Sequence, residues 1–218
     1  MNRLNSVDNH LNLSGWNKSM NRNFTFCVIV SLLFLTAGAF GASRNVPGTY
    51  PNIQAGIDAA SAGDEVVVAS GIYLGAGNRN IDFGGKAITV RSASGNPAVC
   101  VIDCQNAGRG FYFHSGETTA SVMRGFTIIN ADANTLYYGG AIECEGASPT
   151  IDNCIITDSD AAYGGAIDCY NASPLIKNCV MTGNTADFGG AIECSVSSSP
   201  TIFNCLIYGN AATYTGGA

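Results

Sequence analysis

The sequence predicts an all-β solenoid, in which short parallel strands wind into coils of about 25 residues. Three observations predict it. The tetrapeptide Gly-Gly-Ala-Ile begins at residues 139, 164 and 189, so its copies stand 25 residues apart. Within each copy, apolar and polar residues alternate with a period of two, which is typical of strands. The chain also has 27 glycines and only 12% charged residues, a composition too glycine-rich for helices and too apolar for disorder.

The N-terminal segment predicts export. An apolar run at residues 26–40 follows Arg22. At about 15 residues it is shorter than the roughly 20 that span a bilayer. A cleavable signal peptide over residues 20–41 fits better, so we expect a secreted or cell-surface protein of the bacterial export type, with no membrane span in the mature chain. Residues 1–19 form a leader of unassigned role. Translation from Met20 and a retained N-terminal anchor stay open as alternatives.

The predicted mature chain is acidic. From residue 40 onward it has seven basic and fifteen acidic residues, which gives a net charge of −8. An acidic surface repels a phosphate backbone, so nucleic-acid binding is not expected. Divalent cations are the expected counter-charge.

Residues 42–63 are predicted to form an N-terminal cap that closes the first coil. Asn52 is in a suitable place for a helix N-cap, and Gly63 for the helix end. The apolar face of this helix holds Ile53, Ile57 and Ala60. Because such a face covers one open end of a coil core, the solenoid itself is predicted to run from residue 64 to residue 218.

Each repeat is predicted to contain three short strands, separated by glycine, Ser-Pro and asparagine turns. When coils stack in register, equivalent residues lie ~4.8 Å apart and form rows. The predicted inward rows are Ile142, Ile167 and Ile192; Cys144, Cys169 and Cys194; and Cys154, Cys179 and Cys205. Two further kinds of row are predicted, with asparagines at 153, 178 and 204 and at 184 and 210, and with aromatic residues at 138, 163 and 188. The cysteines are expected to be buried free thiols, and inter-coil disulfides are the alternative.

An outward row of carboxylates, Glu143, Asp168 and Glu193, is the predicted metal site. Two unit charges ~4.8 Å apart repel each other by about 0.9 kcal/mol even in bulk water, so a bridging cation would stabilise the row. Ca²⁺, with its flexible oxygen coordination, is the expected ion. The alternative is a solvated acidic face that binds no specific ion.

These residues resemble the right-handed parallel β-helix of the pectate-lyase-like superfamily. The Gly-Gly-Ala-Ile units are similar to the repeats of polymorphic outer-membrane proteins, and the segment Tyr50–Ala60 with Ala62-Gly63-Asp64 looks like an N-terminal entry sequence of that superfamily. The resemblance covers residues 49–218. It implies right-handed coils, but the superfamily contains lyases, hydrolases, epimerases and surface proteins without enzymatic activity, so it implies no single activity.

The function expected from the sequence is extracellular binding or adhesion, to a polysaccharide or to a surface protein. The alternative is a carbohydrate-active enzyme similar to polysaccharide lyases, and a passive spacer is a third possibility. A lyase needs a basic side chain to remove a proton, and the N-terminal coils offer Arg91, Arg109 and Arg124. Such a site would lie in those coils or outside this chain. Because a new repeat opens at the glycine pair Gly216-Gly217 and the sequence stops at Ala218, we also expect the β-helix to be truncated at its C-terminal end.

Overall fold

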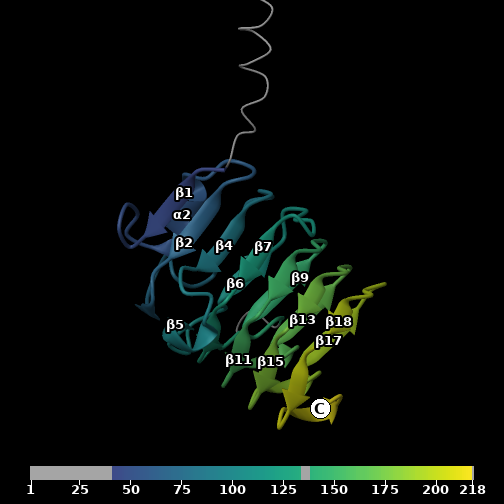
Figure 1. Cartoon of the computed structure of the whole chain (residues 1–218). Coiled ribbons are helices and arrows are strands. Elements are labelled where there is room, and N and C mark those ends of the chain that lie inside the picture. Colours follow the sequence, from purple (N-terminus) through teal and green to yellow (C-terminus); the bar gives the residue numbers. More distant parts are fainter. Residues whose placement is uncertain (1–40, 134–137, 218) are drawn as a thin grey trace, which may run out of the picture. The chain divides into compact units, whose positions relative to one another are not determined.

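The computed structural model of the chain describes residues 41–133 and 138–217. The leader predicted at residues 1–19 and nearly all of the signal peptide predicted at residues 20–41 lie outside the described residues. The described part confirms a parallel β-solenoid, in which equivalent strands of successive coils lie side by side (Figure 1). Its largest sheet has seven strands, so the chain makes six turns between the first strand and the last.

The coils build four sheets, and all neighbouring named strands in them are parallel. The seven-stranded sheet contains β1 (Ser43–Val46), β2 (Glu65–Val68), β4 (Thr89–Ser92), β7 (Val122–Arg124), β10 (Thr150–Asp152), β14 (Leu175–Lys177) and β18 (Thr201–Phe203). The six-stranded sheet contains β3 (Gly71–Tyr73), β5 (Cys100–Asp103), β8 (Thr127–Ile129), β11 (Ile155–Thr157), β15 (Val180–Thr182) and β19 (Leu206–Tyr208). The four-stranded sheet contains β6 (Phe111–Phe113), β9 (Ile142–Glu145), β13 (Ile167–Tyr170) and β17 (Ile192–Ser195). The three-stranded sheet contains β12 (Asp160–Tyr163), β16 (Thr185–Phe188) and β20 (Ala211–Thr215).

The helix α2 (Ile53–Asp58) lies in the segment predicted as the N-terminal cap. Asn52 is its N-cap, as predicted, because the side-chain oxygen of Asn52 accepts a hydrogen bond of 2.8 Å from the backbone N–H of Ala55. Gly56 lets the helix approach the seven-stranded sheet closely, since a Cβ atom at this position would lie 2.9 Å from Cγ1 of Val66. A short 3₁₀ helix, η1 (Pro97–Val99), precedes β5.

The prediction that this helix ends at Gly63 is wrong, because α2 ends at Asp58. The carboxylate of Asp64 accepts hydrogen bonds from the backbone N–H groups of Ser61, at 3.0 Å, and of Ala42, at 2.6 Å. These bonds hold the chain in a turn that leads from the helix into β2. Within the described residues, no helix is long and apolar enough to cross a membrane.

Each regular repeat has four strands, whereas three are predicted. In the repeat that starts at Gly139 they are β9, β10, β11 and β12. The unpredicted strand is β12, with the sequence Asp-Ala-Ala-Tyr, and its inward side chain, Ala161, is small and only 2% exposed. A strand whose core contact is one alanine leaves little hydrophobic pattern in the sequence. Strand β1 lies inside the predicted cap segment and pairs with β2, so the seven-stranded sheet starts there.

Asparagine forms the short turns between the seven-stranded and six-stranded sheets. The φ angles of Asn153, Asn178 and Asn204 are 52°, 56° and 51°, in the left-handed region that asparagine tolerates better than most side chains. The amide of Asn204 donates to Oδ1 of Asn178 at 2.6 Å, which confirms that bond of the predicted row. The second predicted row is also present, because the amide of Asn184 donates to Oδ1 of Asn210 at 2.9 Å.

The inward rows form the core. Ile142 and Ile167 are neighbours across β9 and β13 and are both fully buried, while Ile192 on β17 is partly buried. All eight cysteines of the described part are free thiols, as predicted, and six of them are buried. Cys194 is exposed and Cys205 is partly exposed. The six buried thiols therefore act as small apolar core groups, as predicted, whereas the prediction of a buried thiol is wrong for Cys194.

Aromatic rings stack beside the glycine pairs, as predicted. The ring centroids of Tyr138 and Tyr163 are 5.2 Å apart, and those of Tyr163 and Phe188 are 5.1 Å apart. Tyr214 extends the stack by one more coil, at 5.1 Å from Phe188. Each stacked pair contributes about 0.5–1.5 kcal/mol beyond the area that it buries.

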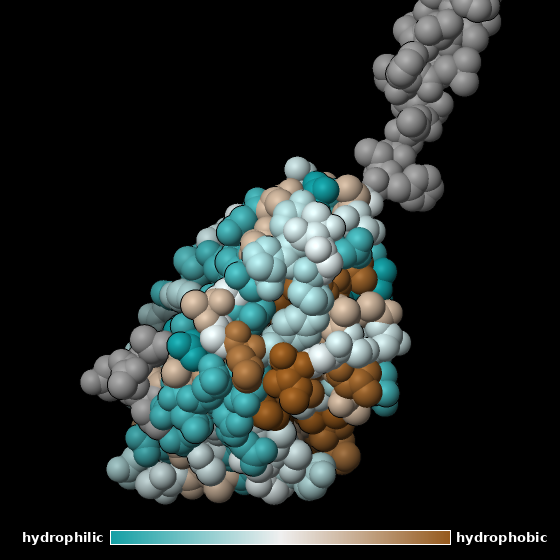
Figure 2. All heavy atoms as spheres, turned by 90° about the vertical axis from the view of Figure 1, so that its left-hand side faces the viewer, coloured by the Kyte–Doolittle hydropathy of each residue, from teal (hydrophilic) through white to brown (hydrophobic). Residues whose placement is uncertain are grey.

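The outer surface of the solenoid is mixed in polarity. Figure 2 views the face on the left of Figure 1 and shows apolar side chains near its middle, among hydrophilic ones. The six-stranded sheet has a row of mostly apolar residues in register, whose members alternate with the buried positions. This row contains Ile72, Val101, Thr127, Ile155, Val180 and Leu206.

Candidate functional site

The three predicted metal ligands are direct neighbours in the structure. Glu143, Asp168 and Glu193 are in register on β9, β13 and β17, on the side of each strand opposite to the buried isoleucines. The prediction of a solvent-exposed acidic face is nevertheless wrong for two of them, because Glu143 is 4% exposed and Asp168 is 0% exposed. Glu193 is partly buried.

The glycine pairs explain this burial. A Cβ atom added to Gly139 would lie 2.7 Å from Cβ of Glu143, and one added to Gly189 would lie 2.8 Å from Oε2 of Glu193. The first glycine of a pair therefore lies directly over the outer face of the strand that follows it. The repeated glycines bring the backbone close enough to cover the carboxylates, which a strand pattern alone does not reveal.

Asp168 is the least satisfied of the three carboxylates. Neither of its oxygens has a hydrogen-bond partner among the described residues. Burial, together with the negative charges of Glu143 and Glu193, raises the pKa of Asp168 to about 7. The side chain therefore exchanges a proton with solvent near neutral pH instead of remaining ionised as most aspartates do.

The row has no preformed metal geometry in the part of the chain that the structure describes. There, no group of three or more His, Cys, Asp and Glu side chains is arranged so that it could hold a metal ion. One of the three carboxylates, Glu143, already has a cationic partner in Arg109. Ca²⁺ binding by the row stays a prediction.

Arg109 fixes Glu143 in place. Its Nη2 atom forms an ion pair with Oε2 of Glu143, and its Nε donates to the carbonyl oxygen of Tyr138 at 2.9 Å. The guanidinium carbon lies 5.0 Å from the ring centroid of Tyr112, over the ring. Burial raises the pKa of Glu143, and the positive charge of Arg109 opposes that shift. Glu143 and Arg109 are thus oriented before any ligand arrives.

These groups line a cavity that we call the tyrosine pocket, with a volume of about 530 Å³. Its lining residues are Arg109, Tyr112, Tyr138, Glu143, Glu145 and Tyr170. Tyr138 and Tyr170 are 40% and 38% exposed, and their ring centroids lie 6.3 Å apart with an interplanar angle of 56°. Both tyrosines are therefore partly exposed, and the buried Arg109–Glu143 ion pair lines the same cavity.

Tyr112 and Glu145 complete the polar part of the tyrosine pocket. The hydroxyl of Tyr112 donates to Oε2 of Glu145. Burial, and then this hydrogen bond, raise the pKa of Tyr112 well above its ordinary value, so the phenol stays protonated. The ring of Tyr112 also stacks on His114 at 4.0 Å, and His114 contacts Asp82 at 3.3 Å. The pocket wall is thus tied to coils on both sides of β6.

The sequence identifies this pocket only in part. Glu143 is a predicted site residue, but its neighbours Tyr112, Glu145 and Tyr170 are not. Tyr170 takes the place of Glu145 one repeat later. This change from a charged to an aromatic residue in an outward row is the feature of the sequence that could have indicated the pocket. Tyr112 lies in β6, outside the regular 25-residue repeats, so its register could not be obtained from the period.

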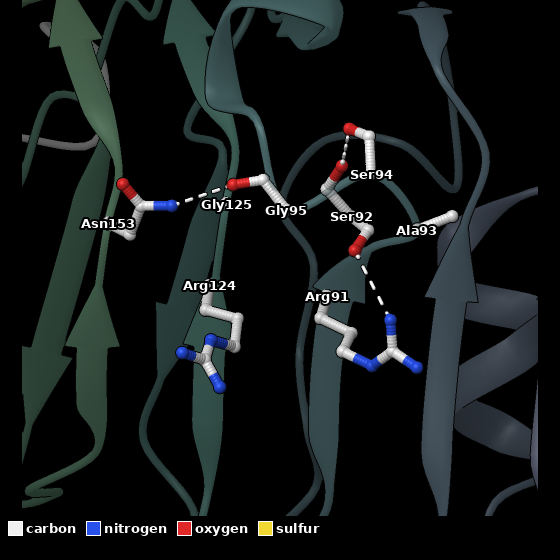
Figure 3. Close-up of a pocket in the computed structure, with 8 residues that line it drawn as sticks. All are labelled: Arg91, Ser92, Ala93, Ser94, Gly95, Arg124, Gly125 and Asn153. Carbon is white, nitrogen blue, oxygen red and sulfur yellow. Dashed lines mark hydrogen bonds between the residues drawn. The ribbon is translucent and has the colours of Figure 1, made fainter.

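A second cavity, which we call the arginine pocket, has a volume of about 310 Å³ and lies at the ends of β4 and β7 (Figure 3). Its lining residues are Arg91, Ser92, Ala93, Ser94, Gly95, Arg124, Gly125 and Asn153. The structure therefore brings together Arg91 and Arg124, two of the three arginines predicted as candidate bases. It places the third, Arg109, in the tyrosine pocket.

A family model described as the right handed beta helix region matches residues 67–217. That range includes both pockets and all of the regular repeats. No curated protein and no solved structure matches the chain.

Proposed function

Since the chain belongs to the right-handed β-helix family, whose coils carry both pockets, we propose that it is an extracellular carbohydrate-binding solenoid with its ligand in the tyrosine pocket. The observation that carries the proposal is the pairing of exposed tyrosine rings with a fixed ion pair in one cavity. Export is supported by the apolar sequence of residues 20–41.

A sugar ring has a face of C–H groups and an edge of hydroxyls, so it needs both an apolar surface and hydrogen-bonding groups. The rings of Tyr138 and Tyr170 offer the apolar surface, because tyrosine combines an apolar face with a polar tip. Arg109, Glu143 and Glu145 offer donors and acceptors for the hydroxyl edge. The volume lies in the usual range for small-ligand cavities, roughly 300–1,000 Å³.

The pocket is also held in shape without a ligand. Arg109 has bonds to Glu143 and to the carbonyl of Tyr138, and Glu145 is held by Tyr112. Side chains that are already ordered lose little conformational entropy on binding, which favours affinity for a small and polar ligand. This supports binding by the free protein without rearrangement of the coils.

The test is a titration of the full chain with a panel of neutral oligosaccharides, followed by calorimetry. Tyr170→Ala should weaken binding by about 10-fold or more, because a ring that packs on the ligand is lost. The matched control is Tyr208→Ala, since Tyr208 is also an exposed strand tyrosine, 52% exposed, but lies on β19 outside the pocket. Equal affinities for the two variants, or no binding by the unchanged protein, would reject the proposal.

A second candidate function is glycoside hydrolysis in the same pocket. It is favoured by Glu143 and Glu145, which are two residues apart on β9 and both line the tyrosine pocket. Residues spaced in this way in a strand have Cα atoms about 6.5–7 Å apart. Burial raises the pKa of Glu143, as a proton donor requires, and glycosidases pair such a donor with a second carboxylate.

The two functions differ in turnover. A hydrolase releases reducing ends, and Glu143→Gln or Glu145→Gln would abolish the release. A lyase would instead produce the absorbance of unsaturated uronates. Arg109 is poorly suited to act as the base of a lyase, because its guanidinium is committed to Glu143 and a guanidinium is not deprotonated in proteins. Binding without either product supports the carbohydrate-binding function.

A further inference from the structure

The arginine pocket is built around two like charges on adjacent strands. Arg91 on β4 and Arg124 on β7 are direct neighbours in the parallel register, although 33 positions separate them in the sequence. Their side chains are 31% and 52% exposed. Neighbouring strands lie ~4.8 Å apart, so the two cations repel each other, and an anion bound near both would reduce that repulsion.

The carboxylates nearby do not balance the cations of this sheet face. Nε and Nη2 of Arg91 both donate to Oε2 of Glu65, at 3.0 and 2.9 Å. Nη2 of Arg124 lies 3.2 Å from Oδ2 of Asp152, and Nζ of Lys177 approaches the same oxygen to 3.7 Å. Three cations therefore share two carboxylates. Asp152 is the single ion-pair partner of Arg124 within the described residues, and the Arg124 side chain is half exposed, so several of its five N–H groups are accessible to a ligand.

Uncharged polar groups border the same cavity. The hydroxyls of Ser92 and Ser94 lie 3.0 Å apart, and the amide of Asn153 donates to the carbonyl oxygen of Gly95 at 2.8 Å (Figure 3). An amide nitrogen carries two N–H groups, so a further donor remains on Asn153. Gly125, with a φ of 80°, keeps the wall clear, because a Cβ atom there would lie 3.2 Å from Cβ of Ser92.

We propose that the arginine pocket is a second ligand site, which binds the carboxylate or sulfate group of an acidic polysaccharide. A guanidinium presents two parallel N–H groups that match the oxygens of either anion. The chain as a whole is acidic, with fifteen acidic and seven basic residues from residue 40 onward, and would repel a closely charged phosphate backbone. A polysaccharide with one charge per sugar places a single anion in the pocket at a smaller electrostatic cost.

This site is independent of the proposed carbohydrate site. The arginine pocket lies on the seven-stranded sheet, whereas most of the tyrosine pocket lies on the four-stranded sheet. A variant of Arg124 should therefore leave the binding of neutral oligosaccharides unchanged. Failure of either proposal can be recognised without reference to the other.

The test measures the affinity of the full chain for four polymers: polygalacturonate as the carboxylate probe, dextran sulfate as the sulfate probe, neutral dextran, and a single-stranded oligonucleotide. Arg124→Gln should weaken binding of the carboxylate or sulfate polymer by about 10-fold or more, because a charged hydrogen-bonding partner is lost. The matched control is Lys177→Gln. Lys177 contacts the same carboxylate of Asp152 but lies outside the pocket, so this variant should change the affinity by less than about 3-fold.

The two acidic polymers distinguish the carboxylate from the sulfate as the preferred group. Equal losses in Arg124→Gln and Lys177→Gln would overturn the proposal, because they would indicate attraction by net charge alone. Binding of neutral dextran or of the oligonucleotide as tight as that of the acidic polymers would also overturn it. Because Arg124 is half exposed, the variant should fold, and an unchanged unfolding midpoint verifies this.

Discussion

Arg109 and Glu143 form an ion pair that is almost wholly buried, with side-chain exposures of 9% and 5%. Arg109 precedes β6 and Glu143 lies in β9, so the pair links neighbouring coils beneath the tyrosine pocket. A buried pair is costly to break, because removal of one partner leaves the other charge uncompensated. Loss of either partner should therefore lower the stability of the coils as well as change the polarity of the pocket.

Arg109→Gln should lower the free energy of unfolding by about 3–5 kcal/mol, because it leaves the Glu143 carboxylate buried and without its cation. Chemical denaturation of the full chain measures this. The matched control is Arg91→Gln, which breaks the Arg91–Glu65 pair, whose side chains are 31% and 39% exposed. That pair should contribute no more than about 1 kcal/mol. Similar losses in the two variants would show that the Arg109 pair is not shielded from water.

Gly164→Ala should destabilise the fold far more than Gly146→Ala. The two glycines have nearly the same φ, 61° and 60°, so an alanine at either position has the same backbone strain of about 1–2 kcal/mol. A Cβ atom at Gly164 would overlap the carbonyl oxygen of Ile167 and lie 2.7 Å from N of Asp168, whereas one at Gly146 would meet nothing within 4 Å. Because the backbone strain is the same in both variants, the difference between their unfolding free energies measures the cost of the steric overlap at Gly164. Equal losses of stability would mean that the turn containing Gly164 can shift to make room for the added Cβ atom.

The fold was predictable where the repeat is regular. The 25-residue period and the period-two alternation place Ile142 beside Ile167 and Cys169 beside Cys194, as the structure has them. Strand β12 was not predictable, because its contribution to the core is a single alanine and its register depends on backbone bonds to the next coil. Backbone pairing without apolar side chains leaves no hydrophobic signal.

The site was less predictable than the fold. The alternation correctly places Glu143 and Asp168 in one row opposite the core, but it cannot show that the preceding glycines fold over that row and bury it. The arginine pocket joins Arg91 to Arg124 across a coil of 33 residues, a length that the 25-residue period does not give. The burial of the carboxylate row and the pairing of the two arginines both depend on the path and length of the segments that connect the strands.

The stability of the fold should fall as the pH rises from about 4 to about 7. The folded-state pKa of Asp168 is raised to about 7, above its ordinary value of 3.8, so between these values the unfolded chain has lost this proton while the folded chain still holds it. Release of the proton therefore favours unfolding over this range, and the loss for a shift of this size is up to about 4 kcal/mol. The raised pKa of Glu143 acts in the same direction.

Asp168→Asn should flatten this pH profile and make the protein more stable than the unchanged chain at about pH 8, because an amide of the same shape carries no charge to bury. Denaturant titrations across the pH range, with a chelator present, measure both effects. Asp187→Asn is a control, since Asp187 is an exposed residue on β16. A profile for Asp168→Asn that still falls with the same slope would show that another group is responsible.

Millimolar Ca²⁺ should raise the unfolding midpoint of the chain through Glu143, Asp168 and Glu193. The two unpartnered oxygens of Asp168 lie between two further carboxylates, so a divalent cation would relieve both their repulsion and their lack of partners. At a concentration 100 times the dissociation constant, the gain is about 2.7 kcal/mol. Because the ion must displace the proton of Asp168, the gain should be larger at about pH 8 than at about pH 6. Calorimetric scans with Ca²⁺ and with a chelator measure it, and the combined variant Glu143→Gln/Asp168→Asn/Glu193→Gln should show no rise. A midpoint of the unchanged chain that stays constant in Ca²⁺ would reject the predicted ion, and an equal rise in the combined variant would place the ion elsewhere.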